Sequence, residues 1–134
     1  MTTEFVILTP ILLSFLCLVI LTGRMVDARS DIIGAANDAA RVASLQDTGG
    51  SAAAQAQLAA TDSVNGERLN CAGGGPDVQT QFLPDGDFVR GGTVHVTVEC
   101  TVNTSDLAFT NFIVPASFTI TEEAWEPIDA HRSL

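Results

Sequence analysis

Glu4 stands at the entrance of a long apolar segment, and the chemistry that a carboxylate offers there is ion pairing rather than catalysis. The segment that follows, Phe5 to Gly23 (FVILTPILLSFLCLVILTG), contains no charged residue. About 20 apolar residues in a helix span the hydrocarbon core of a bilayer. A carboxylate at membrane depth is costly unless it is paired, and the α-amino group of Met1 is the nearest cation. We therefore interpret Glu4 as a candidate functional residue, with the ammonium group of Met1 as its nearest possible partner.

The remaining ionisable residues suggest no catalytic centre. His95 is predicted to stand alone on the solvent face of a strand, and His131 belongs to a C-terminal tail. Asp85 and Asp87 offer two oxygens, whereas a calcium loop needs six or more. Three carboxylates near the C-terminus lie close in sequence but need a cleft to act together: Glu122, Glu123 and Glu126. We predict no enzymatic activity, no metal site and no cofactor.

The three cysteines fall into two classes. Cys17 lies inside the apolar segment, where it acts as a small hydrophobic residue. Cys71 and Cys100 lie in the polar remainder, and in a membrane-tethered extracytoplasmic domain they most simply form a disulfide. Two free thiols or metal ligands are the alternative, although no nearby His or Cys completes a set of four donors.

The composition limits the partners. The chain has 134 residues with 16 acidic residues against 6 basic ones, all of them Arg, and its net charge is -10. Binding to nucleic acid needs clustered Lys and Arg, so we predict none. About 110 residues remain after the apolar segment, enough for one small domain.

The apolar segment itself has two interpretations. A secretory signal peptide would carry a basic region and a shorter apolar core, and neither is present. Pro10 is compatible with a membrane helix, because such helices tolerate proline. The segment is therefore interpreted as a membrane or filament-core helix, with Phe5, Pro10, Phe15 and Leu18 as its filament-core residues. A plain single-pass anchor stays open, and in that case Glu4 is merely an interfacial residue.

Helical character continues beyond Gly23. Between Arg24 and Leu45 an apolar stripe recurs at spacings of three and four. Its members are Met25, Ala28, Ile32, Ala35, Ala39 and Val42. We expect one helix from about Thr3 to Leu45, roughly 65 Å long at 1.5 Å per residue. The predicted organisation is an apolar helix over 1–23, an amphipathic helix over 24–46 and a small head domain over 47–134.

The head domain is predicted to contain one helix followed by strands. Residues 46–50 (QDTGG) stop the first helix with the glycine expected past a C-terminus, and Ser51 caps a second, short helix. Val78 to Leu83 and Thr93 to Val102 are predicted strands, with Val94, Val96, Val98 and Cys100 on the core face of the second. A further strand surrounds Phe118 to Thr121, before an acidic tail. The fold class is α+β, a long helix packed on a small antiparallel sheet.

The first third of the chain resembles the N-terminus of TadE-like proteins, pilin-like subunits of tight-adherence (Flp-type) pili in the type IV pilin superfamily. The matching features are T-x-E-F before the apolar run, Leu-Thr-Pro at its start, Gly-Arg and Asp-Ala-Arg at its exit, and the motif Ala-Ala-x-x-Ala-Ala-Arg-x-Ala-Ser. The remainder, with two Cys around short strands, resembles the actinobacterial members.

The resemblance implies an order of processing and assembly, and it implies an assembly or register contact for Glu4 and Met1. A prepilin peptidase removes a short leader, the apolar helix rests in the cytoplasmic membrane, and an ATP-driven platform assembles the subunits into an extracellular filament. Superfamily pilins carry their glutamate at mature position five, whereas here it is residue 4. Either the first residue has been trimmed or replaced, or the register is unusual.

Two classes of function stay open at this point. In the first, the chain is a filament subunit, major or minor, whose partners are copies of itself or other pilins. In the second, it is an anchored extracellular binding domain that does not polymerise. A binding domain should expose an apolar patch, and four residues before the last strand are candidates for such a patch or for the core: Phe109, Phe112, Ile113 and Val114.

Overall fold

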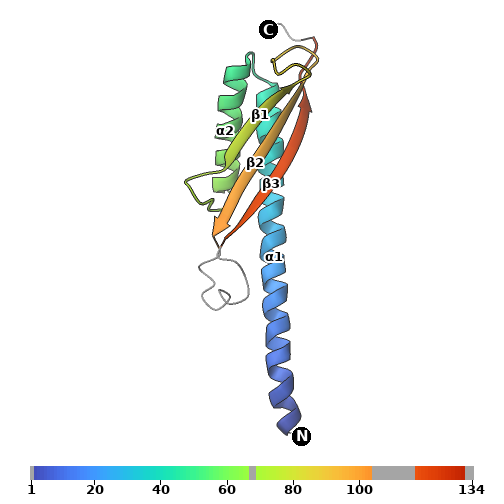
Figure 1. The fold of residues 1–134 in the computed structure, drawn as a ribbon, viewed down its shortest axis with the longest axis vertical. Coiled ribbons are helices and arrows are strands. Elements are labelled where there is room, and N and C mark those ends of the chain that lie inside the picture. Colours follow the sequence, from blue (N-terminus) through green and yellow to red (C-terminus); the bar gives the residue numbers. More distant parts are fainter. Residues whose placement is uncertain (1, 67–68, 104–116, 132–134) are drawn as a thin grey trace. The chain divides into compact units, whose positions relative to one another are not determined.

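The computed structural model describes residues 2–66, 69–103 and 117–131 (Figure 1). In chain order its elements are α1 (Thr2–Ser44), α2 (Gly49–Gly66), β1 (Asp77–Leu83), β2 (Thr93–Asn103) and β3 (Ser117–Pro127). The chain divides into two compact units, Met1–Ser30 and Asp31–Leu134. The predicted α+β class is confirmed, and so is a first helix that ends within a residue of Leu45.

The second unit is built from the end of α1, α2 and a three-stranded sheet. Both helices bury a stripe of mostly small side chains, and the stripe on α1 is the one that its apolar periodicity predicts. On α1 the fully buried residues are Ile32, Ala35, Ala36, Ala39, Ala40 and Ala43, and on α2 they include Ala52, Ala56 and Ala60. The two helices are in contact, because Ser63 Oγ of α2 donates to Asp38 Oδ2 of α1 at 2.7 Å. Of the predicted stripe, Ala28, Ile32, Ala35 and Ala39 are buried, Val42 is half-buried and Met25 is exposed.

The connection between the helices differs from the expectation. The end of α1 is closed by short-range bonds, in which the amides of Leu45 and Gln46 donate to the carbonyls of Val42 and Ala43. The glycines predicted to stop this helix instead open α2, which begins at Gly49. Thr48 is the N-terminal cap rather than Ser51, because the Ser51 amide donates to Thr48 Oγ1 at 3.3 Å.

The sheet is an antiparallel meander in the order β1-β2-β3. Along β2 exposure alternates, and Val94, Val96, Val98 and Cys100 are buried as predicted. This face packs toward the helices, and the opposite face is the outer face of the sheet. The first two strands confirm their predicted ranges within a residue. The prediction of an acidic tail after Thr121 is wrong, because β3 continues through Pro127 and pairs with β2 along its whole length.

The turn between β1 and β2 depends on glycine at two places. Gly91 has a φ of +74°, in the region that favours glycine. At Gly92, a Cβ atom would lie 2.7 Å from the carbonyl oxygen of Leu83. The predicted tight turn at residues 90–92 therefore needs the smallest residue for steric reasons as well as conformational ones.

Candidate functional site

The first unit is a helix whose apolar side chains have no cover. Phe5 is 77% exposed, Phe15 65% and Leu18 58%, and Pro10 lies inside the helix without ending it. By length and composition the helix qualifies as a candidate membrane span, with a mean hydropathy of 2.7 and none of its most apolar window buried. An exposed apolar surface of this size marks a site that contacts lipid or another protein.

The polar side chains within the apolar segment satisfy themselves inside the helix. Thr9 Oγ1 donates to the carbonyl of Phe5 at 2.6 Å, and Ser14 Oγ donates to Ile11 at 2.9 Å. Thr22 Oγ1 lies 3.0 Å from the carbonyls of both Leu18 and Val19. Hydrocarbon offers no hydrogen-bonding partner, so the internal bonds of these three side chains make the segment compatible with an environment free of water.

The predicted register residues are not brought together in what the structure describes. Glu4 belongs to α1, but its side chain lies outside the described parts, and Met1 lies outside the described residues altogether. Their contact therefore stays a prediction. The same holds for the predicted patch at Phe109, Phe112, Ile113 and Val114, which also lies outside the described residues.

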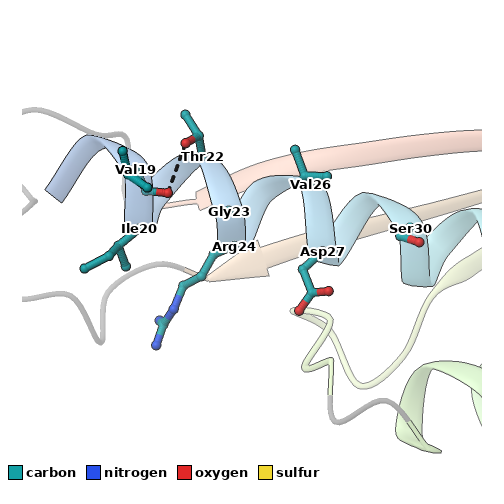
Figure 2. A pocket seen from close by; sticks show the side chains of 8 residues that line it. All are labelled: Val19, Ile20, Thr22, Gly23, Arg24, Val26, Asp27 and Ser30. Atoms are coloured by element: carbon teal, nitrogen blue, oxygen red, sulfur yellow. Dashed lines mark hydrogen bonds between the residues drawn. The ribbon is translucent and has the colours of Figure 1, made fainter. Parts of the chain in front are cut away.

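A shallow groove marks the point where the helix changes from apolar to charged (Figure 2). It is lined by Val19, Ile20, Thr22, Gly23, Arg24, Val26, Asp27 and Ser30. Nothing lies within 4 Å of the position that a Cβ atom would take at Gly23. Arg24 and Asp27 project from the same side of the helix. Here α1 presents apolar contact surface and both signs of charge within one turn.

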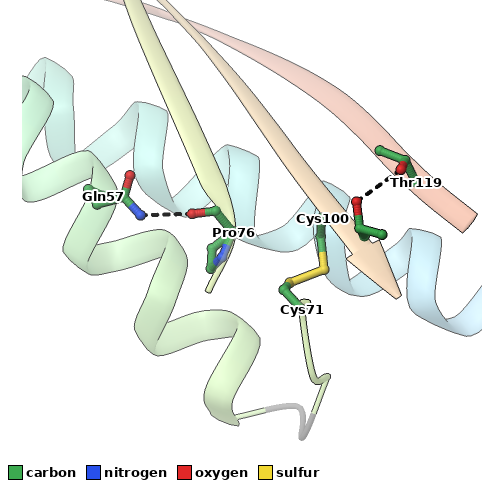
Figure 3. The surroundings of a disulfide bond; sticks show 6 residues. Gln57, Cys71, Pro76, Cys100 and Thr119 are labelled. Carbon is green, nitrogen blue, oxygen red and sulfur yellow. Dashed lines mark hydrogen bonds between the residues drawn. A yellow bond between two sulfur atoms is a disulfide. The ribbon is translucent and has the colours of Figure 1, made fainter. Parts of the chain in front are cut away.

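The predicted disulfide is present. Cys71 and Cys100 are bonded, with a sequence separation of 29 and a Cα–Cα distance of 5.3 Å (Figure 3). Cys100 is buried on the core face of β2. The backbone of Cys71 forms an isolated antiparallel β-bridge with Val102. The amide of Ala72 also donates to the carbonyl of Thr101 at 2.7 Å. The disulfide therefore fastens the connection between α2 and β1 to the central strand.

A second hydrogen bond holds the other end of that connection. Gln57 Nε2, on α2, donates to the carbonyl of Pro76 at 2.8 Å (Figure 3). Pro76 directly precedes β1. The glycine triplet at 73–75, with positive φ at all three residues, is thus held at both ends. This explains how a segment without regular structure keeps a defined course.

The outer face of the sheet holds an arrangement that the sequence analysis missed. His95 is not alone there, because its ring stacks on that of Trp125 with centroids 3.8 Å apart and planes at 12°. Its Nε2 also lies 3.2 Å from Oε2 of Glu123, at ion-pair distance but without the alignment of a hydrogen bond. The polar–apolar alternation of residues 117–121 stops at the adjacent glutamates Glu122 and Glu123, so no local signal extends the strand to Trp125 or reveals its pairing with His95.

No catalytic arrangement emerges among the residues that the structure describes. Within them no group of three or more His, Cys, Asp or Glu residues is arranged to hold a metal ion. His131 Nδ1 lies 3.7 Å from its near neighbour Asp129 on an exposed turn. Asp85 and Asp87 are exposed in the turn after β1.

Comparisons with known proteins are limited to the N-terminal part of the chain. A family model described as TadE-like protein matches residues 1–41. No curated protein and no solved structure matches the chain. The similarity therefore covers the apolar helix and most of its amphipathic continuation, and the sheet and the disulfide lie outside it.

Proposed function

We propose that this protein is a pilin-like structural subunit, held in the membrane by α1 and assembled through that helix into an extracellular filament. The observation that carries the proposal is the uncovered apolar surface of α1 from Phe5 to Gly23, in the segment that is similar to TadE-like proteins. A lipid bilayer covers such a surface before assembly, and the helices of neighbouring subunits cover it in a filament.

The proposed role of Glu4 is to set the register between subunits. A carboxylate inside a bundle of apolar helices lacks water, so its best partner is the ammonium group at the N-terminus of a neighbouring subunit. A subunit placed out of register would leave a buried charge unpaired, which is strongly destabilising. The contact would therefore select one axial position out of many that packing alone allows.

The proposed localisation is the cytoplasmic membrane before assembly and the cell surface afterwards. The disulfide between Cys71 and Cys100 supports a head domain on the oxidising side of the membrane. The expected partners are copies of this chain or other pilins, a prepilin peptidase that matures the N-terminus and an assembly platform that extracts the subunit from the membrane.

The decisive experiment replaces Glu4 in cells that express the chain and its assembly machinery. Glu4→Ala should insert into the membrane normally, as judged by resistance to alkaline extraction, yet yield no filaments in electron microscopy of sheared material. Thr3→Ala, one residue away, is the matched control and should assemble. Mass spectrometry of the fibre should identify this chain and its mature N-terminus. Normal filaments from Glu4→Ala would refute the register role, and absence of the chain from wild-type fibres would refute the subunit role.

An anchored binding domain that does not polymerise is the second candidate. The observation that favours it is Trp125, a large aromatic residue that is 55% exposed on the outer face of the sheet. The two candidates separate in the sheared fraction, because an anchored domain stays with the membranes whatever residue stands at position 4.

A further inference from the structure

We propose that the outer face of the sheet binds an extended segment of another protein that carries Lys or Arg at alternate positions. The surface consists of Asp77, His95, Glu99, Glu123 and Trp125, and we call it the acidic-aromatic face. Strand pairing places these residues together, since Asp77 lies opposite Glu99, Thr97 opposite Glu123 and His95 opposite Trp125. The proposal does not depend on whether the subunit polymerises.

The distribution of charge favours a cationic partner. Residues 1–30 contain two acidic residues, Glu4 and Asp27, and two basic ones, Arg24 and Arg29, so their net charge is zero. The whole net charge of -10 therefore belongs to residues 31–134. On the described outer face the strands carry carboxylates but no Lys or Arg. A field of one sign raises the rate of association with a partner of the opposite sign.

Asp77 and Glu99, which lie opposite one another, fit a role in binding a ligand better than a role in stabilising the fold. Two like charges directly opposite one another in a sheet are destabilising, and both residues are exposed. Among the described residues no cation forms an ion pair with either of them. A positively charged side chain of the ligand that lies between the two carboxylates would remove this repulsion. The same pair of charges therefore destabilises the free domain and stabilises the complex.

Trp125 supplies a second attractive contact at the other end of the same face. His95 covers one face of the indole ring, and 55% of the residue is exposed. Trp is the best aromatic partner for a cation above its ring plane. Since stacking on His95 fixes the orientation of the ring, an incoming guanidinium meets a preorganised surface.

The spacing of these residues fits an extended chain. Residues two apart on a strand lie roughly 7 Å apart. The cross-strand pairs that contain Trp125, Glu123 and Glu99 follow one another along the sheet at this spacing. Alternate side chains of an extended ligand repeat at the same distance. A second copy of this chain does not meet the requirement, because it has no Lys and its six Arg are never two residues apart.

The test uses the full chain in zwitterionic detergent micelles and a fluorescein-labelled peptide, Arg-Ser-Arg-Ser-Arg-Ser, followed by fluorescence anisotropy. The peptide Glu-Ser-Glu-Ser-Glu-Ser should not bind. Asp77→Asn and Trp125→Phe should each weaken binding of the basic peptide about two- to fivefold, the size expected for loss of one exposed ionic or cation–π contact. Asp85→Asn removes the same charge from the turn outside this face and should leave the affinity unchanged.

A second measurement separates binding from general electrostatics. Asp77→Asn should raise the unfolding midpoint while it weakens the peptide complex, because it removes the repulsion with Glu99. Trp125→Phe keeps an aromatic ring beside His95, so this variant is expected to fold. Circular dichroism checks that it does. Equal weakening by Asp85→Asn and Asp77→Asn would overturn the proposal, and so would binding of the acidic peptide or no binding of the basic one at millimolar concentration.

Discussion

The imidazole of His95 lies flat against the indole of Trp125, with ring centroids 3.8 Å apart and an angle of 12° between the planes. The two residues are opposite one another on β2 and β3. Only 12% of the His95 side chain is exposed, whereas Trp125 is 55% exposed. The histidine therefore serves as the half-buried support of an aromatic ring that faces solvent. Since the chain has one Trp and no Tyr, the fluorescence of this ring reports on the folding of the sheet.

Replacing His95 should weaken the sheet. His95→Ala removes the stacking contact and is expected to lower the free energy of unfolding by about 1 kcal/mol, the usual value for a cross-strand aromatic pair. Urea unfolding in micelles, followed by Trp125 fluorescence, measures the effect. His131→Ala is the matched control, because its side chain is 96% exposed. A loss of stability of equal size in both variants would contradict the role assigned to the stack.

Removing the disulfide should have a larger effect. In the chain-entropy model, closing a loop of this size stabilises the folded state by roughly 3–4 kcal/mol. The double variant Cys71→Ser/Cys100→Ser should therefore unfold at a much lower urea concentration than the wild type. Cys17→Ser changes the unpaired thiol in the apolar helix and should leave the unfolding of the sheet unchanged. If the double variant unfolded at the wild-type midpoint, the bond would not stabilise the domain.

The start of α2 provides a test of its cap. Thr48→Ala removes the oxygen that accepts a hydrogen bond from the Ser51 amide and should destabilise the domain by about 1 kcal/mol. Ser51→Ala leaves this acceptor in place and should have a smaller effect. Thermal unfolding by circular dichroism at 222 nm compares the two. A larger loss in Ser51→Ala would mean that Ser51, as the sequence pattern predicts, is the more important capping residue.

Two small residues of α1 should respond in opposite directions. Ala39 is fully buried, so Ala39→Leu forces a larger side chain into the packed helices and should cost about 1–3 kcal/mol. At Gly34 an added methyl group would have no other atom within 4 Å, so Gly34→Ala should stabilise the helix by about 0.5–1 kcal/mol. Urea unfolding in micelles measures both. If Gly34→Ala raises stability but prevents filament formation, a neighbouring subunit contacts the helix at this residue.

The sequence alone determined the elements whose signals are local. An uncharged run of 19 residues predicts an apolar helix that is long enough to span a membrane, whatever follows it. Apolar spacing of three and four carries that helix on to Ser44, and strict alternation from Thr93 to Cys100 identifies the central strand and its buried face. The disulfide could also be predicted from the sequence, because Cys71 and Cys100 are the two cysteines outside the apolar segment.

The tertiary structure decided what depends on residues far apart in the chain. The charged sequence Glu122 to Glu126 looks like a tail by itself, yet pairing with β2 makes it part of a strand. His95 looked solitary because its partner, Trp125, comes 30 positions later, and only the register sets the two opposite one another. Local patterns record whether a side chain prefers to be buried. Which side chain it meets there follows from strand order and register, and these are set by packing the whole domain.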